Sequence, residues 1–127
     1  MTERITIPLD VAKDSRSGYI DNYDRITRGC GRLMLFAGDQ KAEHLNDDFY
    51  GAGIDQQDND PEHLFRIASE AKIGVFAAQL GLIARFGMDY SEVPYLIKLN
   101  SKTNLVKATQ ADPISHRWLD ISQVIEF

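Results

Sequence analysis

Apolar and polar residues follow one another in blocks along this chain, and the blocks predict alternating strands and helices. Residues 32 to 39, RLMLFAGD, form an apolar run ending in Gly-Asp, which is typical of a strand buried on both faces. Residues 73 to 79, IGVFAAQ, predict a second buried strand. Residues 95 to 100, YLIKLN, follow Pro94 and predict a third strand that carries a lysine among apolar residues.

Helical signals fill the intervals between these strands. Asp60 and Pro61 form an N-cap followed by a first-turn proline, and GLIARFG, residues 81 to 87, predicts a short helix ended by Gly87. The first of these helices has an apolar stripe made of Leu64, Ile67, Ala68 and Ala71. Strands alternating with helices indicate parallel pairing with right-handed crossovers, as in a (β/α) barrel or a doubly wound sheet.

The two ends of the chain carry weaker patterns. Residues 4 to 11 alternate in hydrophobicity and predict an extended edge segment, and residues 20 to 31 predict a brief helix that starts at Asp21 or Asn22. Residues 118 to 127, WLDISQVIEF, contain the spacing of a capping box at Asp120 and Gln123 and stop after about two turns. Three strands and a short last helix leave open sheet edges, so we expect the front part of a larger fold.

Composition and charge exclude several classes of function. The formal net charge is −5 without any basic block, so we expect no nucleic-acid partner and no anionic membrane partner. Cys30 is the only cysteine, which rules out an internal disulfide and suits a reducing compartment. No stretch approaches the roughly 18 apolar residues of a spanning helix, and no signal peptide is evident, so the expected location is the cytoplasm.

Lys98 and Asp39 are the main candidates for chemistry. Alternation along a strand puts Leu96, Lys98 and Asn100 on one face and the neighbouring apolar residues on the other. Asp39 closes the first strand, and in a (β/α) barrel the active site lies at this end of the strands. The two side chains could pair, with Lys98 binding a phosphate or carbonyl oxygen and Asp39 moving protons. The alternatives are a purely structural ion pair or a Lys98 side chain that reaches out to water.

The loop after the first strand gathers acidic residues and a histidine. A histidine with carboxylates could bind a divalent metal, but no short metal-binding motif is matched, so we expect a solvated loop and no metal. The residues concerned are Asp39, Glu43, His44, Asp47 and Asp48. His63 and His116 have no evident partners in the sequence and are predicted to lie on the surface.

Four segments together resemble a known enzyme family. LMLFAGDQKAEH and PYLIKLNSKT are similar to the first and third strands of the archaeal-type class I fructose-bisphosphate aldolases, and DPEHLFRIASEA with IGVFAAQ fills the interval at a similar spacing. The segment DPISHRWLDISQVIEF resembles the approach to the fourth strand of that family. The resemblance covers roughly residues 22 to 127.

This resemblance implies an α/β fold, the N-terminal part of a (β/α)8 TIM barrel that is incomplete in this chain. Residues 1–31 would be an N-terminal extension with a short helix, and residues 32–127 the first three β/α units with the start of the next helix. The implied activity is Schiff-base cleavage or formation of a carbon–carbon bond in a ketose phosphate such as fructose 1,6-bisphosphate, in glycolysis or gluconeogenesis. The implied enzyme uses no cofactor and is a homo-oligomer.

The same resemblance assigns roles to individual residues. Asp39 would lie near the imine and Lys98 would be its polar neighbour, while Gln40, His44 and Asn100 would contact the substrate. The imine-forming lysine would lie beyond the end of this chain, so these 127 residues alone are expected to be inactive.

Three questions stay open at this point. Lys41 stands where the family usually has glycine, and some relatives make other sugar-derived ketones or act as thiolases, so the substrate is not fixed. A metal-dependent lyase or hydrolase that uses residues 39 to 48 is one alternative function. A non-catalytic partial barrel, completed by self-association or by a second polypeptide, is the other.

Overall fold

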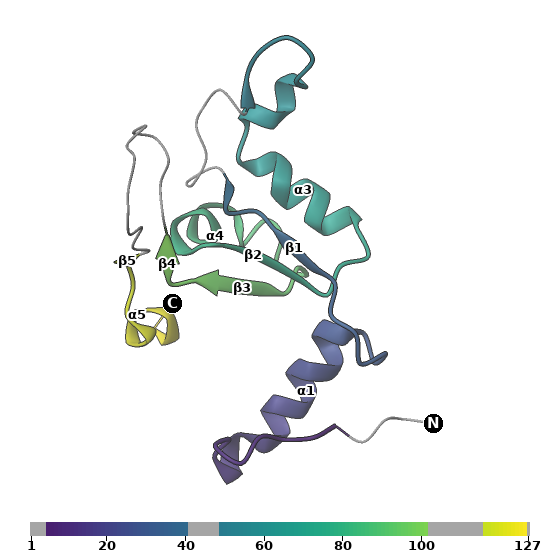
Figure 1. The fold of residues 1–127 in the computed structure, drawn as a ribbon, viewed down its shortest axis with the longest axis vertical. Helices are drawn as coiled ribbons and strands as arrows, with labels where there is room; N and C mark the ends of the chain where they lie inside the picture. The colour runs from purple at the N-terminus through teal and green to yellow at the C-terminus, as the bar shows by residue number, and fades with distance from the viewer. Residues whose placement is uncertain (1–4, 41–48, 102–115, 127) are drawn as a thin grey trace, which may run out of the picture.

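Three parallel strands form the centre of the structure, a computed structural model that describes residues 5–40, 49–101 and 116–126. The strands are β1 (Leu35–Ala37), β2 (Val75–Gln79) and β3 (Tyr95–Lys98), in the spatial order β1-β2-β3 (Figure 1). Both pairings are parallel, as the alternation of strands and helices predicts. Because parallel neighbours need crossover connections, each pair is joined by a segment that contains a helix.

Two helices pack on one face of this sheet. Helix α3 (Glu62–Glu70) follows the short 3-10 helix η3 (Gln56–Asn59) and joins β1 to β2, and α4 (Leu80–Phe86) joins β2 to β3. Their apolar residues meet the outward-facing residues of the strands in one core. Its buried members are Phe65, Ala68, Ile73, Phe76, Ala78, Ile83 and Val93.

The opposite face of the sheet is open. Leu35 and Leu96 on this face are 42% and 43% exposed, whereas Tyr95 and Ile97 on the helical face pack against the core. The prediction that the first strand is buried on both faces is therefore wrong, because no described element covers its second face. The central strand β2 is buried from Val75 to Ala78, as predicted, since it has a neighbouring strand on either side.

Helix α3 begins as the sequence predicts and packs differently. The Asp60 carboxylate accepts a hydrogen bond from the backbone N–H of Glu62 at 3.0 Å, which caps the helix. The most buried side chain is Phe65, with none of its surface exposed, and it lay outside the predicted stripe. Ile67, which the stripe included, is 38% exposed. Ala68 is buried and Leu64 packs against the core, as the stripe predicts, so the prediction is confirmed in part.

The N-terminal segment is helical for longer than predicted. Residues 5–11 form no strand, so the predicted extended edge is wrong; a turn closes there through a bond from Val11 N–H to Pro8 O. The short 3-10 helix η1 (Lys13–Ser15) leads into α1 (Arg16–Thr27), which starts before the predicted caps. Helix α1 ends where Arg28 adopts a left-handed conformation with φ of 53°.

The C-terminal part forms a second, smaller unit. The third strand ends at Lys98, and β4 (Asn100–Ser101) pairs antiparallel with β5 (His116–Arg117) in a separate sheet. Helix α5 (Ile121–Ile125) begins with the predicted capping box between Asp120 and Gln123. Across the described residues, no helix is both long enough and apolar enough to cross a membrane.

Candidate active site

Asp39 and Lys98 meet at the carboxyl ends of the strands. The Lys98 ammonium donates a hydrogen bond to the Asp39 carboxylate, and the two side chains are only 25% and 21% exposed. The pairing expected from the sequence is therefore present. Partial burial weakens screening by water, so the two charges interact more strongly here than an exposed surface pair would.

The ion pair spans the central strand of the sheet. In the register, Gln79 lies opposite Lys98 and Ala37 lies opposite Ala77, so Asp39, two residues after Ala37, falls level with Gln79 and Lys98. Neighbouring strands are about 4.8 Å apart, which puts the backbones of β1 and β3 roughly 10 Å apart. The long lysine side chain bridges this distance over the open face of the sheet.

Gln79 connects the end of β2 to the backbone of Asp39. The Gln79 Nε2 atom donates a hydrogen bond to the main-chain oxygen of Asp39 at 3.1 Å. The Gln79 Oε1 atom is buried and has no hydrogen-bond partner in the described part of the chain. Gln79 is not among the residues predicted from the sequence, although a polar side chain at the end of an apolar strand is a signal that could have identified it.

Gly38 lets the first strand approach its neighbour closely enough to set Asp39 in place. A Cβ atom at Gly38 would lie 2.1 Å from the ring of Phe76. The Gly38 N–H donates to the main-chain oxygen of Ala77 at 2.8 Å, which extends the pairing of β1 and β2 to the residue before Asp39. A side chain at position 38 would push the two strands apart and displace the carboxylate.

A cavity of about 670 Å³ opens beside Lys98. Its polar wall contains Gln79, Lys98, Asn100 and Ser101. The other walls are mostly apolar and come from α4, from the segment after β5 and from the residue between β3 and β4. They include Leu80, Leu82, Leu99, Trp118 and Leu119. This volume suits a small-molecule ligand, and polar groups on one side could fix the ligand's orientation.

Of the remaining predicted site residues, two lie near the ion pair or the cavity and the others fall outside the described residues. Gln40 follows Asp39 directly and is half-buried, and Asn100 lines the cavity. His44, Lys41 and the acidic residues of 43 to 48 lie outside the described residues, so the predicted substrate contact of His44 and the alternative metal cluster have no structural counterpart here. Within the ranges that the structure describes, no group of three or more potential metal-ligating side chains occurs.

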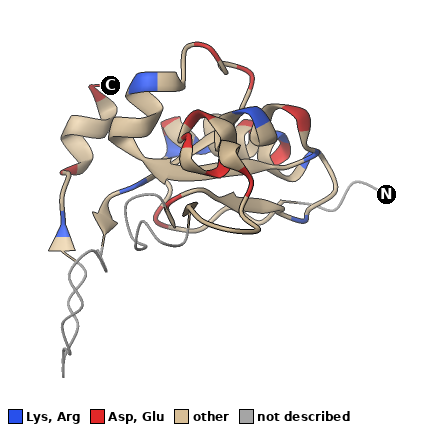
Figure 2. Cartoon of the chain, turned by 90° about the horizontal axis from the view of Figure 1, so that it is seen from above, with Lys and Arg blue, Asp and Glu red and all other residues tan. Residues whose placement is uncertain are grey.

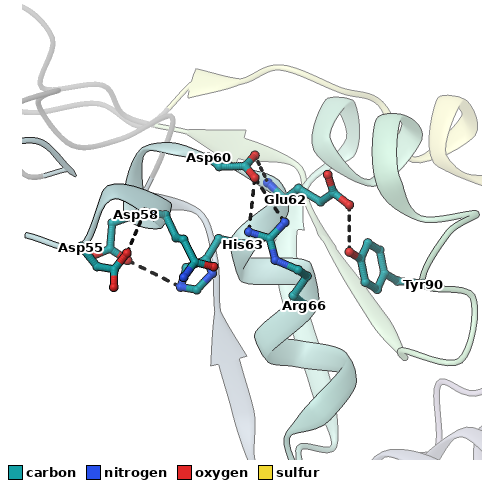
Figure 3. Close-up of polar contacts among 8 residues, drawn as sticks. Asp55, Asp58, Asp60, Glu62, His63, Arg66 and Tyr90 are labelled. Atoms are coloured by element: carbon teal, nitrogen blue, oxygen red, sulfur yellow. Dashed lines mark hydrogen bonds and ion pairs between the residues drawn. The ribbon is translucent and has the colours of Figure 1, made fainter.

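A second polar network surrounds the start of α3 (Figure 3). The Arg66 guanidinium contacts the Asp60 carboxylate at 3.3 Å, and Tyr90 donates a hydrogen bond to Glu62 at 2.9 Å. Burial raises the pKa of Tyr90, and the contact with the Glu62 carboxylate raises it further. These contacts tie α3 to the segment before β3.

His63 belongs to this network and corrects the prediction of an unpartnered surface histidine. Its side chain is 21% exposed, and its Nε2 atom lies 3.7 Å from the Asp58 carboxylate (Figure 3). His116, in β5, is exposed as predicted. Lys98 is the only charged residue within the three parallel strands, and the charges in Figure 2 otherwise lie mostly on helices and loops.

Comparisons with known proteins point to one family. The sequence profile of the DeoC/LacD family aldolases matches residues 33–127. The fructose-bisphosphate aldolase/6-deoxy-5-ketofructose 1-phosphate synthase of Methanocaldococcus jannaschii is 55% identical over 122 residues, which are 96% of this chain and 39% of that protein.

Two solved structures share the fold. The fructose-bisphosphate aldolase from Slackia heliotrinireducens is 57% identical, with a TM-score of 0.91 over 99% of this chain and 40% of its own. A Schiff base forming fructose-1,6-bisphosphate aldolase is 26% identical, with a TM-score of 0.65 over 84% of this chain and 39% of its own. The chain thus spans about two fifths of the length of these proteins. Its sheet is the predicted incomplete part of an aldolase TIM barrel.

Proposed function

This chain belongs to the DeoC/LacD family of aldolases, and from that premise we propose that the protein is a Schiff-base lyase acting on a ketose phosphate such as fructose 1,6-bisphosphate. The observation that carries the proposal is the partly buried ion pair between Asp39 and Lys98 at the carboxyl ends of the strands. This is the end at which TIM-barrel enzymes hold their active sites. Three similar proteins are all named fructose-bisphosphate aldolases, which supports the choice of substrate.

The proposed reaction needs an amine, a base and a group that binds anionic oxygens. A neutral lysine amine, placed by the proposal beyond Phe127, adds to the ketone and loses water to form an iminium ion. A base removes the proton of the C4 hydroxyl, the C3–C4 bond breaks, and its electron pair moves to the iminium nitrogen. An aldehyde leaves, and the enamine is protonated and hydrolysed to release the ketone and the free lysine.

Asp39 and Lys98 have separate parts in this proposal. The Asp39 carboxylate lies near the reacting carbons and transfers protons. The Lys98 ammonium binds a phosphate or carbonyl oxygen and holds Asp39 in position, and it is not the nucleophile. Gln40, His44 and Asn100 contact the rest of the substrate, and of these Asn100 lines the cavity beside Lys98.

The open face of the sheet belongs to the same proposal. Leu35 and Leu96 are exposed on the face that carries Asp39 and Lys98, which is the lumen face in a barrel. We assign the cover of this face to the remaining strands of the barrel, and the assembled enzyme to a homo-oligomer. The unpaired edges of the described sheet, at β1 and β3, support an assembly of several copies of the protein.

The proposed function is tested by the cleavage of fructose 1,6-bisphosphate to two triose phosphates by the complete protein, with and without EDTA. A Schiff-base lyase keeps its full rate in EDTA. Loss of activity in EDTA, restored by a divalent ion, would replace the proposal with the metal-dependent alternative. No cleavage of this or any related ketose phosphate would contradict both the Schiff-base lyase and a metal-dependent lyase.

A further inference from the structure

Gln79 occupies the middle of the row formed by Asp39 and Lys98. It is the last residue of β2, it lies opposite Lys98 in the register, and it lies on the open face of the sheet with Ala77 and Val75. Because the ion pair joins β1 to β3, it has to cross the position of Gln79. The amide is therefore placed to influence both charged groups.

The contacts of Gln79 determine how its amide is oriented. The bond from Nε2 to the main-chain oxygen of Asp39, at 3.1 Å, requires the nitrogen on the β1 side, because the reverse orientation would bring two oxygen atoms together. The last backbone bond between these strands is the one from Gly38 N–H to Ala77 O. The side chain of Gln79 thus continues the connection of β1 and β2 one residue past the end of the backbone pairing, at Asp39 itself.

We propose that Gln79 is a positioning residue that holds the backbone of Asp39 so that its carboxylate faces Lys98. Without this bond, the connections of Asp39 to the sheet among the described residues would be its neighbour Gly38 and its own ion pair. Gly38 has no side chain to restrict the backbone, so the carboxylate would take up more orientations. Loosening Asp39 should in turn weaken the hold on Lys98, because the Asp39 carboxylate is one of the groups that bind the ammonium.

The free oxygen of Gln79 extends the proposal to the ligand. Oε1 is a buried acceptor without a partner in the described residues, and Gln79 lines the cavity with Lys98. Such an acceptor is costly unless a donor reaches it. Carbonyl oxygens and unprotonated phosphate oxygens only accept, so they suit the ammonium of Lys98. Sugar hydroxyls can donate, so they suit Oε1. Resting on the proposed function, the inference is that a hydroxyl of the ketose phosphate donates to Gln79.

The positioning role is tested by competitive acetylation of lysines with trace acetic anhydride, read by mass spectrometry on the folded, complete protein. The exposed Lys72 serves as the internal reference in each sample. Asp39→Asn, which removes the carboxylate that binds Lys98, sets the scale for the loss of this contact. Gln79→Met has a similar length and no hydrogen-bonding amide, and we expect it to raise the labelling of Lys98 at least threefold relative to Lys72.

A Lys98 labelling ratio in Gln79→Met equal to that of the wild type would overturn the positioning role. If this variant does not fold, as judged by circular dichroism, Gln79→Asn takes its place. Its amide is one methylene too short to reach the Asp39 carbonyl, so the same rise is expected and its absence is equally decisive. A general loosening of the fold would also change the circular dichroism spectrum, whereas the proposal predicts a changed Lys98 ratio with an unchanged spectrum.

The ligand contact is tested by calorimetric binding of fructose 1,6-bisphosphate and of sulfate, an anion without a hydroxyl, to the wild type and to Gln79→Met. Both ligands register the loosening of Lys98, but only the sugar phosphate loses the acceptor for its hydroxyl, so we expect its affinity to fall about tenfold more than that of sulfate, the effect of one lost hydrogen bond. Equal losses of affinity for the two ligands would overturn the contact. Failure of the wild type to bind any ketose phosphate would instead contradict the proposed function, and the acetylation result would still decide the positioning role.

Discussion

Asp39 and Lys98 form an ion pair although the strands that carry them are not neighbours. Strand β2 lies between β1 and β3, and the lysine side chain reaches across it over the open face of the sheet. A purely structural pair would be expected to join adjacent elements, or to lie at the surface. The position across the centre of the open face, beside a cavity, is what makes this pair the centre of the candidate site.

The ammonium of Lys98 should matter for catalysis far more than for folding. We expect Lys98→Met to lower kcat/KM for fructose 1,6-bisphosphate by about 10²-fold or more, the effect of removing one preorganised electrostatic group. Lys98→Arg keeps the charge and should retain part of the activity. Lys72→Met removes an exposed lysine outside the candidate site and should leave kcat/KM unchanged. Equal rates for Lys98→Met and the wild type in a steady-state assay would exclude a role for this group.

Phe65 should be the most sensitive position of the core. It is fully buried, and its ring contacts those of Phe76, Phe86, Tyr90 and Tyr95 at centroid distances from 4.9 to 6.0 Å. We expect Phe65→Ala to lower the free energy of unfolding by about 3–5 kcal/mol, measured by urea titration.

The matched control for Phe65 is Ile67→Ala on the same helix. Ile67 is 38% exposed, so its truncation removes fewer contacts and should cost clearly less. If the two substitutions cost the same, the buried face of α3 has been assigned wrongly.

Two glycines should respond to alanine in opposite ways. A Cβ atom at Gly74, just before β2, would lie 1.9 Å from the backbone oxygen of Ile26 in α1. Gly74→Ala must therefore displace one of these two segments, which should destabilise the fold. Gly81, in α4, has no atom within 4 Å of its Cβ position, and Gly81→Ala should stabilise the helix by about 0.4–1 kcal/mol. Thermal unfolding of the two variants measures both effects, and a rise in Tm for Gly74→Ala would show that α1 does not pack here.

Alkaline pH should weaken the packing of α3 against the segment before β3. Burial raises the pKa of Tyr90 and of Tyr95 above the ordinary value of about 10, so the folded state holds these protons more tightly than the unfolded state does. This contribution to stability is complete below about pH 10 and is lost as the pH rises through the raised pKa values of the folded state.

Tyr90→Phe isolates one of these two groups. The variant loses the hydrogen bond to Glu62, so its free energy of unfolding should be lower than that of the wild type at pH 8. Because the variant has one tyrosine fewer to ionise, its free energy of unfolding should fall less steeply than that of the wild type between pH 10 and 12. Urea titration at each pH measures this. Parallel curves for the two proteins would mean that Tyr90 does not contribute to the alkaline transition.

The order of the elements and the facing residues of the strands could be predicted from the sequence, because they depend on local periodicity. Apolar runs at 32 to 39 and 73 to 79 and the alternation around Lys98 determine which residues face the helices and which face the lumen. Parallel pairing places the carboxyl ends of β1 and β3 at the same edge of the sheet, and this alone brings Asp39 and Lys98 near each other. These inferences needed no knowledge of tertiary contacts.

Other features could not be predicted, because they depend on contacts between distant segments. The exposure of β1 arises from the absence of a covering element among the described residues, which a strand's own residues cannot reveal. Phe65 is buried through its contacts with four other aromatic rings from different segments. Gln79 acquires its role from the backbone of Asp39, forty residues earlier in the chain.

Trapping of the imine is the most direct test of the central claim, that Lys98 assists a reaction whose nucleophile is another lysine. The complete protein is incubated with fructose 1,6-bisphosphate, reduced with borohydride, digested and mapped by mass spectrometry. The account predicts a single ketose phosphate adduct on a lysine outside residues 1 to 127, with Lys98 unmodified. An adduct on Lys98 itself would contradict it.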